Sequence, residues 1–473
     1  MSLTAIGVLL LPLSTLLLLA RPHWLLFAVV ASAPFSATAL LNIESATFGV
    51  QPYHWFGGLL LVGYLIRPGS VVAARVTGSD ILPGVWLAAL AIAILASLYA
   101  LSWRAQPTLY NLTQTVLVLF GITVSFAVFR ASCREGRLHT AISCMLWAHV
   151  FVTAWGFFQF ALFRFGLPYP DWLFNNSASE SAQLFDQVLE AAVPRVSSVA
   201  IEPSFLARQL LSALALALAL GGIHPAPVRA PLAAMAILFT AGLILSTSTT
   251  ALIGLMPIAA YVLIRRTRLA LLAVAPAVAV AVVVICVAPN FLDALKEVTV
   301  EKSNTGSFTE RTASVADGIA GFAKSPWLGQ GWASINSWDL LFSLLANVGV
   351  IGTAAFGGFV LSLLLPTLSI AIARPLGPAR GARVVEGVGL AFAVALMADA
   401  VSGISYVTGN LWVLSGLLWA AIAVHRRSAR TPREEWDGPR VFPSGRYYKS
   451  RTASPPHSDI EVLCRNTSNE SSF

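Results

Sequence analysis

The chain has 473 residues, of which 57% are hydrophobic and 11% are charged, and its mean hydropathy is +0.75. Soluble globular proteins carry roughly 25% charged residues, so this composition excludes a water-soluble protein. The formal net charge of +8 does not indicate a nucleic-acid partner, because many arginines stand in short gaps between apolar runs, where they set membrane topology.

Apolar runs of membrane-spanning length recur along the sequence. A helix needs about 20 apolar residues to cross the hydrocarbon core, so we predict an all-α fold, a polytopic transmembrane bundle of about thirteen spans. The first is predicted to be a retained span, since no basic residue precedes it. The predicted spans are 4–20, 24–43, 54–67, 82–102, 109–129, 140–163, 203–222, 230–246, 249–264, 269–288, 341–366, 386–404 and 409–424.

Basic residues gather in alternate gaps between these spans. Because positive charge stays in the cytoplasm, these gaps and the C-terminus are predicted to be cytoplasmic, and an odd number of spans places the N-terminus outside. Arg104 is the single exception among the short gaps. The arginine-bearing gaps hold Arg21; Arg67 and Arg75; Arg130, Arg134 and Arg137; Arg229; Arg265, Arg266 and Arg268; and Arg374, Arg380 and Arg383.

Two long loops, 165–201 and 289–340, carry most of the chain on the opposite side, which the topology makes periplasmic. The predicted domains are therefore a transmembrane bundle with these loops over 1–424 and a cytoplasmic tail over 425–473. The tail is rich in Pro, Ser, Arg and Asn and almost lacks apolar periodicity, so it is predicted to be disordered.

Polar residues cluster where the first long loop enters the seventh span. Pro203 suits the first turn of a helix, which places Glu202 at the positive end of the helix dipole. Ser204 and Arg208 are four residues apart and share a helix face. Charged groups beside a bilayer are functional candidates, and so is Arg195 upstream. The alternative is that Glu202 caps the helix and Arg208 reaches to the interface.

A second cluster lies in the other long loop. Arg311 opens a stretch with Val315, Ile319, Phe322 and Ala323 on one side, which predicts an amphipathic helix against the membrane surface. The Pro- and Gly-rich turn Pro-Trp-Leu-Gly-Gln-Gly follows, and then Trp338 and Asp339 just before the eleventh span. The alternative is an ordinary solvated surface loop.

Other site chemistries find little support in the sequence. The hydroxyls of Ser246–Thr250 are interpreted as satisfying backbone carbonyls in a tight turn. No Walker-type loop and no His-Glu-x-x-His motif occurs, and the histidines and cysteines lack metal-ligand spacing. We therefore predict no metal site and no cofactor.

The order of these motifs resembles the O-antigen ligase and polysaccharide polymerase family of bacterial inner-membrane proteins. The resemblance covers roughly residues 195–352, about a third of the chain. Ser246–Thr249 is similar to the family's Ser-x-Ser-Arg, Pro326–Gly331 to its Pro-Leu-x-Gly-x-Gly turn, and Trp338–Gly352 to its His-Asn-x-x-Leu…Glu-x-Gly-Leu-x-Gly. Arg311 falls where a loop arginine is expected, and Arg195–Arg208 resembles a stretch of exopolysaccharide polymerases.

Two departures bear on the activity that the resemblance implies. Trp338 stands where the ligases have a loop histidine, and Thr249 replaces the arginine of Ser-x-Ser-Arg. Both favour a polymerase that joins polyprenyl-diphosphate-linked repeat units at the periplasmic face of the inner membrane. The alternatives are a ligase that transfers a finished glycan to lipid A core or protein, and a non-enzymatic transporter or lipid-linked sugar flippase.

The implied enzyme is a metal-independent membrane glycosyltransferase whose partners are the bilayer and lipid-linked glycan donor and acceptor. A chain-length regulator is a further candidate partner. Arginine offers forked donors to phosphate oxygens, so Arg195, Arg208 and Arg311 are the candidates for diphosphate binding. The acceptor hydroxyl needs a base or an orienting carboxylate, for which Glu202 and Asp339 both remain candidates.

Overall fold

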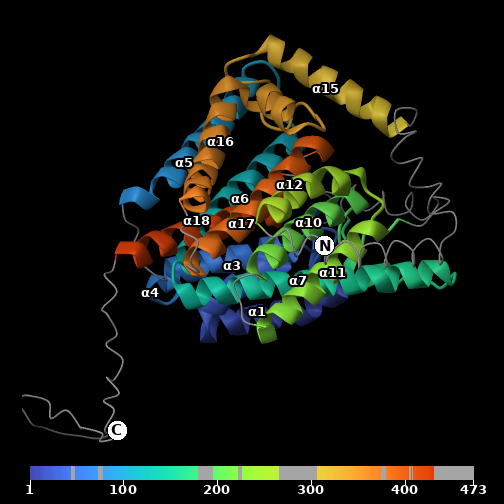
Figure 1. Cartoon of the computed structure of the whole chain (residues 1–473). Helices are drawn as coiled ribbons and strands as arrows, with labels where there is room; N and C mark the ends of the chain where they lie inside the picture. The colour runs from blue at the N-terminus through green and yellow to red at the C-terminus, as the bar shows by residue number, and fades with distance from the viewer. Residues whose placement is uncertain are drawn as a thin grey trace, which may run out of the picture. The chain divides into compact units, whose positions relative to one another are not determined.

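The computed structural model describes residues 1–43, 48–72, 78–178, 195–221, 226–265, 306–373, 380–403, 406 and 408–430. Helices dominate this part of the chain (Figure 1). Within it, six helices are long and apolar enough to cross a membrane, so the protein is an all-α membrane protein. They are α5 (Leu82–Ser102), α6 (Leu109–Ser132), α7 (Glu135–Arg164), α10 (Pro203–Leu220), α16 (Leu340–Ile372) and most of α17 (Arg380–Ser402).

The remaining helices are shorter or less apolar, and thirteen spans with two long loops stay a prediction. The tenth predicted span, 269–288, lies outside the described residues. The shorter elements are α1 (Ala5–Ala20), η1 (Pro22–Trp24), α2 (Leu25–Ser32), α3 (Pro52–Ile66), α4 (Pro68–Val71), η3 (Gly78–Asp80), α8 (Asp171–Phe174), α11 (Ala226–Leu245), α12 (Thr249–Arg265), α15 (Gly306–Lys324) and α18 (Gly409–Arg430).

The second predicted span, 24–43, is wrong as a single helix. After η1, α2 ends at Ser32, because Pro34 has no N–H to donate to the next helical hydrogen bond. The chain then forms a small antiparallel sheet in the order β1 (Ser2–Leu3), β2 (Leu41–Ile43), β3 (Phe48–Val50). Hydropathy alone does not distinguish this buried turn and strand from a continuing helix.

At its C-terminal end, α18 runs to Arg430, past the predicted boundary of the bundle at 424. The described residues all belong to one compact unit, 1–430. The rest of the tail, 431–473, is a second unit that lies outside the described residues, so its disorder stays a prediction.

Segments that the predicted topology places on the same side contact one another. At one end of the bundle, Arg427 donates to the backbone oxygen of Cys133 (3.3 Å) and to the carboxylate of Asp80 (3.4 Å). At the other end, Arg104 donates to the hydroxyl of Ser325 (3.1 Å). These contacts agree with the predicted alternation of loops. We call the first the inner end and the second the outer end; that the inner end is cytoplasmic stays a prediction.

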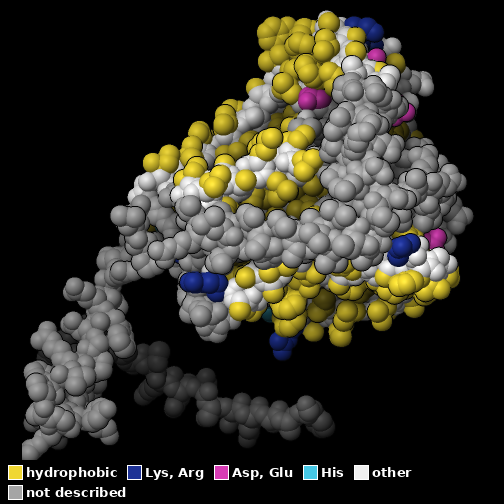
Figure 2. Space-filling view, turned by 45° about the vertical axis from the view of Figure 1, so that its right-hand side comes forward, with side chains coloured by type: hydrophobic (Ala, Val, Ile, Leu, Met, Phe, Trp, Pro, Cys, Tyr) yellow, Lys and Arg dark blue, Asp and Glu magenta, His cyan; other side chains and the backbone are white. Residues whose placement is uncertain are grey.

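The centre of the bundle is formed by α10, α17 and α18. Nearly every side chain of α10 is buried, and α17 packs against both α10 and α18. Small residues allow this close approach: a Cβ on Gly387 of α17 would lie 3.1 Å from the Cβ of Ala219 of α10. Other helices expose apolar side chains outward, and Figure 2 shows broad hydrophobic surfaces with few charged side chains between them.

Helix α16 is interrupted at Gly349, and the Pro326–Gly331 turn fills the interruption. Gly349 has φ 64°, and the helix bonds freed around it are made by the turn. The backbone N–H of Gln330 donates to the oxygen of Ala346 (2.7 Å), and the N–H of Val350 donates to the oxygen of Pro326 (2.8 Å). Glycine therefore suits both the Pro326–Gly331 turn and position 349 of α16, because the backbones of the turn and the helix touch there and leave no room for a side chain.

We predict that Gly349→Ala lowers the free energy of unfolding by more than about 2 kcal/mol. An alanine there would need a left-handed backbone, and its Cβ would lie 2.2 Å from the backbone oxygen of Trp327. Gly357→Ala, in the same helix, is the matched control, since its Cβ would meet nothing within 4 Å. Thermal unfolding in detergent measures both; equal transition temperatures would contradict the interlocked turn.

Candidate functional site

The segment that carries Arg195 is held against α7. The buried Oε1 of Gln159 accepts hydrogen bonds from the backbone N–H groups of Ser197 (3.1 Å) and Ser198 (2.7 Å). Ser198 has φ 54°, and its hydroxyl donates to the backbone oxygen of Val152 (2.6 Å). This turn fixes the backbone next to Arg195 at the outer end of the bundle. The neighbouring stretch 179–194 lies outside the described residues.

The start of α10 follows the predicted pattern, with Pro203 in its first turn and Glu202 at the N-cap position. The Glu202 side chain makes no capping hydrogen bond; its carboxylate accepts one from the hydroxyl of Ser204. The alternative interpretation of Glu202 as a helix cap is therefore wrong. Its carboxylate is half-buried beside the other charged groups of this region.

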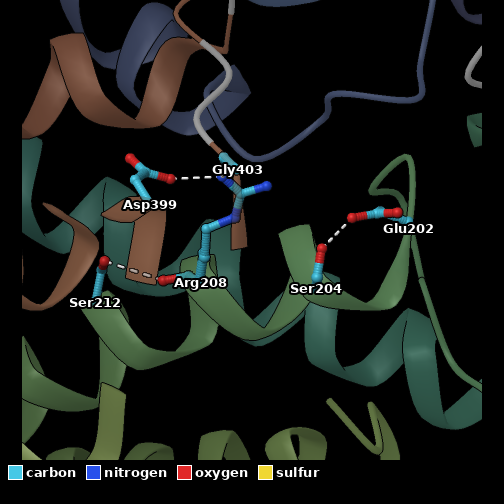
Figure 3. A network of polar contacts seen from close by, with 6 residues as sticks. All are labelled: Glu202, Ser204, Arg208, Ser212, Asp399 and Gly403. Atoms are coloured by element: carbon cyan, nitrogen blue, oxygen red, sulfur yellow. Dashed lines mark hydrogen bonds and ion pairs between the residues drawn. The ribbon is translucent and has the colours of Figure 1, made fainter. Parts of the chain in front are cut away.

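Arg208 is buried and does not reach the interface, which overturns the other half of that alternative. Its Nη1 donates to Oδ1 of Asp399 in α17 (2.5 Å), as Figure 3 shows, and to the backbone oxygen of Gly403 (2.6 Å). The ring of Phe205 lies 3.8 Å from the guanidinium carbon. One edge of the guanidinium and one of its faces are thereby fixed.

The opposite edge of the same guanidinium has no partner among the described residues. Both Nε and Nη2 of Arg208 are buried and make no hydrogen bond, and the same is true of Nε of Arg195. Burying such donors without an acceptor costs free energy, and the cost is larger for a charged group. These buried N–H groups therefore remain donors without an acceptor among the described residues.

The helix predicted in the second long loop is confirmed as α15 (Gly306–Lys324), which packs on α16. The side that faces the protein includes Ser314, Gly318 and Gly321, whereas Ile319 of the predicted apolar side is 47% exposed. Arg311 lies on the inward side, half-buried. Contact of the opposite side with a membrane surface stays a prediction.

Trp338 contacts both Arg311 and Gly403, whose backbone oxygen accepts a hydrogen bond from Arg208. The guanidinium carbon of Arg311 lies 5.6 Å from the centre of the Trp338 ring, within the range of a cation–π interaction. The backbone N–H of Trp338 donates to the hydroxyl of Ser314 (3.2 Å), and a Cβ on Gly403 would lie 3.0 Å from the ring. The residue in the place of the ligase histidine is thus an aromatic platform.

Electrostatic coupling shows that the predicted charged residues converge. The pKa of Arg195 is lowered overall, mainly by burial. The negative charge of Glu202 acts to raise this pKa, and the positive charge of Arg311 acts to lower it. The pKa of Arg311 is also lowered overall, again mainly by burial. Here too Glu202 acts to raise the pKa, and the positive charge of Arg208 acts to lower it. Such effects need proximity, so three arginines from distant parts of the sequence share one region with one carboxylate.

Asp339 has a structural role at the start of α16. It is the N-cap of α16, where its Oδ1 accepts from the backbone N–H of Phe342 (2.9 Å). Burial raises the pKa of Tyr406, and both Asp399 and Asp339 raise it further, which places these carboxylates around the phenol. The structure therefore brings Glu202 into the electrostatic surroundings of Arg195 and Arg311, and it engages Asp339 as a helix cap.

Sequence reasoning missed Asp399, although a signal was present. It is an acidic residue inside the predicted span 386–404, and an ionisable residue in a span is by default a candidate for function. Of the hydroxyls in Ser246–Thr250, that of Ser246 donates to the backbone oxygen of Leu243 (2.7 Å) as interpreted, whereas that of Thr247 is buried without a hydrogen-bond partner among the described residues. Among the residues that the structure describes, no His, Cys, Asp or Glu side chains group in threes around a possible metal ion.

Comparison with known families tests the resemblance directly. A family model described as O-antigen ligase matches residues 234–340. This segment matches the O-antigen ligase family. The predicted resemblance is thus confirmed, and it indicates a membrane enzyme that transfers glycans, of the ligase or polymerase kind. Arg311, Trp338 and Asp339 lie within the O-antigen ligase match, whereas Arg195, Glu202, Arg208 and Asp399 lie outside it. No curated protein matches the chain.

Proposed function

We propose that this protein is a polysaccharide polymerase that joins polyprenyl-diphosphate-linked repeat units at the periplasmic face of the bacterial inner membrane. The observation that carries the proposal is the convergence of Arg195, Arg208 and Arg311 at the outer end, with buried N–H donors of Arg208 left open. A sugar diphosphate held at a membrane surface is an anion of matching chemistry.

In the proposed reaction, an acceptor hydroxyl oxygen forms a bond to the anomeric carbon of the donor sugar. The bond between that carbon and the diphosphate oxygen breaks, and its electron pair leaves with the diphosphate. Arg208 and Arg311 stabilise the negative charge that develops on the leaving group. The proton of the acceptor hydroxyl passes to the carboxylate of Glu202.

Glu202 is the better candidate for this proton transfer because of its neighbours. Its carboxylate raises the pKa of both Arg195 and Arg311, so a diphosphate bound by these arginines would lie near it. Asp339 already accepts a hydrogen bond from the backbone as a helix cap. The hydroxyl of Ser204 donates to the carboxylate of Glu202, so this carboxylate is able to accept a hydrogen bond from a hydroxyl group.

We predict that Glu202→Gln lowers the transfer rate at least about 100-fold, since general base catalysis contributes typically 10²–10⁴-fold. Asp339→Asn is the matched control and is expected to stay within about twofold of wild type, because Asn caps a helix as well as Asp does. Single-turnover rates with a lipid-linked repeat unit measure both. A large loss in Asp339→Asn with full activity in Glu202→Gln would reverse the assignment.

Product length separates a polymerase from a ligase. Purified protein given a lipid-linked repeat unit is expected to produce a ladder of longer glycans on a gel, and the ladder is expected to persist with a chelator such as EDTA. Trp338 in the place of the ligase histidine supports the polymerase. Transfer only to lipid A core or protein would instead establish a ligase, and loss of the ladder with EDTA would contradict metal independence.

A further inference from the structure

A second charged region lies at the inner end of the bundle, away from the chemistry proposed above. There α3 meets η1 and α4, since a Cβ on Gly63 of α3 would lie 3.5 Å from Val71 of α4 and 3.6 Å from Pro22 of η1. The start of α7 completes the region, because Arg137 reaches α4 from it. Four arginines stand at these helix ends, and we call them the inner arginine cluster: Arg21, Arg67, Arg134 and Arg137.

Two members of this cluster are held in place by backbone carbonyl groups. Arg137 donates from Nη1 to the oxygen of Val71 (2.7 Å) and from Nη2 to that of Ser70 (3.0 Å). Arg67 donates from Nη1 to the oxygen of Leu19 in the last turn of α1 (2.8 Å). A carbonyl group carries no net charge, so these bonds fix the two guanidinium groups without neutralising them.

The positive charge of the inner arginine cluster exceeds the negative charge beside it. None of its members forms an ion pair with another residue that the structure describes. Helices α1–α4, α6 and α7 contain one carboxylate, Glu135, which lies 3.7 Å from His139. Asp80, a further carboxylate at this end, already faces Arg426 and Arg427. The C-terminal ends of α1, α3 and α6 add about −0.5 of a charge each, so with Glu135 they offset only part of the four positive charges.

His23 lies within this cluster and adds no charge to it. Burial lowers the pKa of His23, and the positive charges of Arg137 and Arg21 lower it further. At pH 7 its imidazole is therefore neutral, and the excess charge belongs to the arginines. The effect of both arginines on one imidazole also shows that the end of α1 and the start of α7 share one region, since such effects need proximity.

An exposed apolar surface borders the cluster. Leu19 of α1 and Leu65 of α3 are 63% and 78% exposed, and each stands two residues before an arginine of the cluster. Trp24 is 46% exposed, and the guanidinium carbon of Arg21 lies 6.0 Å from the centre of its ring. Tryptophan and arginine beside exposed leucines are typical of the level of the lipid head groups, with acyl chains along the leucines.

We propose that the inner arginine cluster binds the head-group phosphate of an anionic phospholipid in the adjacent leaflet. Arg21 and Arg67, which are both exposed, hold the phosphate, and the acyl chains lie along Leu19 and Leu65. A guanidinium offers forked donors to phosphate oxygens, and an anionic lipid, unlike a zwitterionic one, brings a net negative charge to this excess of positive charge. The site is independent of the glycan chemistry at the outer end.

The test is native mass spectrometry of the full-length, delipidated protein with phosphatidylglycerol or phosphatidylcholine in detergent. Wild type is expected to retain phosphatidylglycerol in preference to phosphatidylcholine. The double variant Arg21→Gln/Arg67→Gln is expected to reduce phosphatidylglycerol retention about 25-fold, since each basic residue near an anionic lipid surface contributes about a factor of five. Arg164→Gln is the matched control and should leave retention unchanged, because it removes an exposed arginine from the opposite end of α7.

A second double variant separates the charge from the structure of the helix ends. Arg21→Lys/Arg67→Lys keeps both positive charges, so it should keep most of the preference for phosphatidylglycerol although the forked donors are lost. Equal retention of the two lipids by wild type, or an equal loss in Arg21→Gln/Arg67→Gln and Arg164→Gln, would overturn the proposal. A loss in Arg21→Lys/Arg67→Lys as large as that in Arg21→Gln/Arg67→Gln would do the same.

Discussion

Replacing Arg311 by alanine is expected to reduce glycan chain growth at least about 100-fold while the protein still inserts. Removing one fixed donor aimed at developing charge typically costs 10²–10³-fold in rate, and Arg311 shares its region with Arg208 and Glu202. The measurement is polymer length in cells that lack the endogenous enzyme, with the membrane level of each variant determined alongside. Single repeat units should accumulate in place of long chains.

Lys324→Ala is the matched control for Arg311→Ala. Lys324 is an exposed cation at the other end of the same helix, α15, so its loss removes equal charge without touching the site. Arg311→Lys should recover only part of the activity, because a lysine lacks the planar fork of donors. Full polymer output from a well-expressed Arg311→Ala variant would remove Arg311 from the mechanism.

Replacing Asp399 by alanine is expected to lower both stability and activity. Breaking a buried ion pair leaves the remaining charge uncompensated and costs about 3 kcal/mol or more. The Arg208 guanidinium would lose its Nη1 acceptor and, with it, the orientation that turns Nε and Nη2 away from Asp399 (Figure 3). Thermal unfolding in detergent and the rate of the first transfer step measure the two effects.

A double variant distinguishes positioning from folding. In Arg208→Leu/Asp399→Leu neither charge of this buried pair remains, and apolar replacements of a buried pair are often neutral or stabilising. The transition temperature should therefore return toward that of wild type, whereas transfer should stay lost because the phosphate donors are gone. A double variant that is stable and active would show that this ion pair has no part in the reaction.

Trp338 gives the departure from the ligase pattern a physical meaning. In this chain the position holds a ring beside Arg311 and against Gly403, whose carbonyl accepts from Arg208. An indole cannot take up a proton at neutral pH, so proton transfer must come from elsewhere. The same ring instead links the two arginine sites, because it contacts one guanidinium and the loop that binds the other.

The helices of the described bundle were largely predictable from hydropathy, and the failure at 24–43 is instructive. In a bilayer the backbone must satisfy its own hydrogen bonds, so length and apolar composition suffice to indicate most spans. The buried turn after Ser32 is apolar enough to pass for part of a span, and Pro34 is the signal in the sequence that ends the helix. Here local chemistry outweighs average hydropathy.

By itself, the sequence determined the membrane class, and it predicted the alternation of the loops and the arginines of the candidate site, because these follow from composition, charge placement and motif order along the chain. The tertiary structure alone decided that Arg208 pairs with Asp399, 191 positions away, and that Glu202 lies among the arginines while Asp339 caps a helix. Such pairings depend on which helices become neighbours when they pack, and local patterns in a sequence carry no information about that choice.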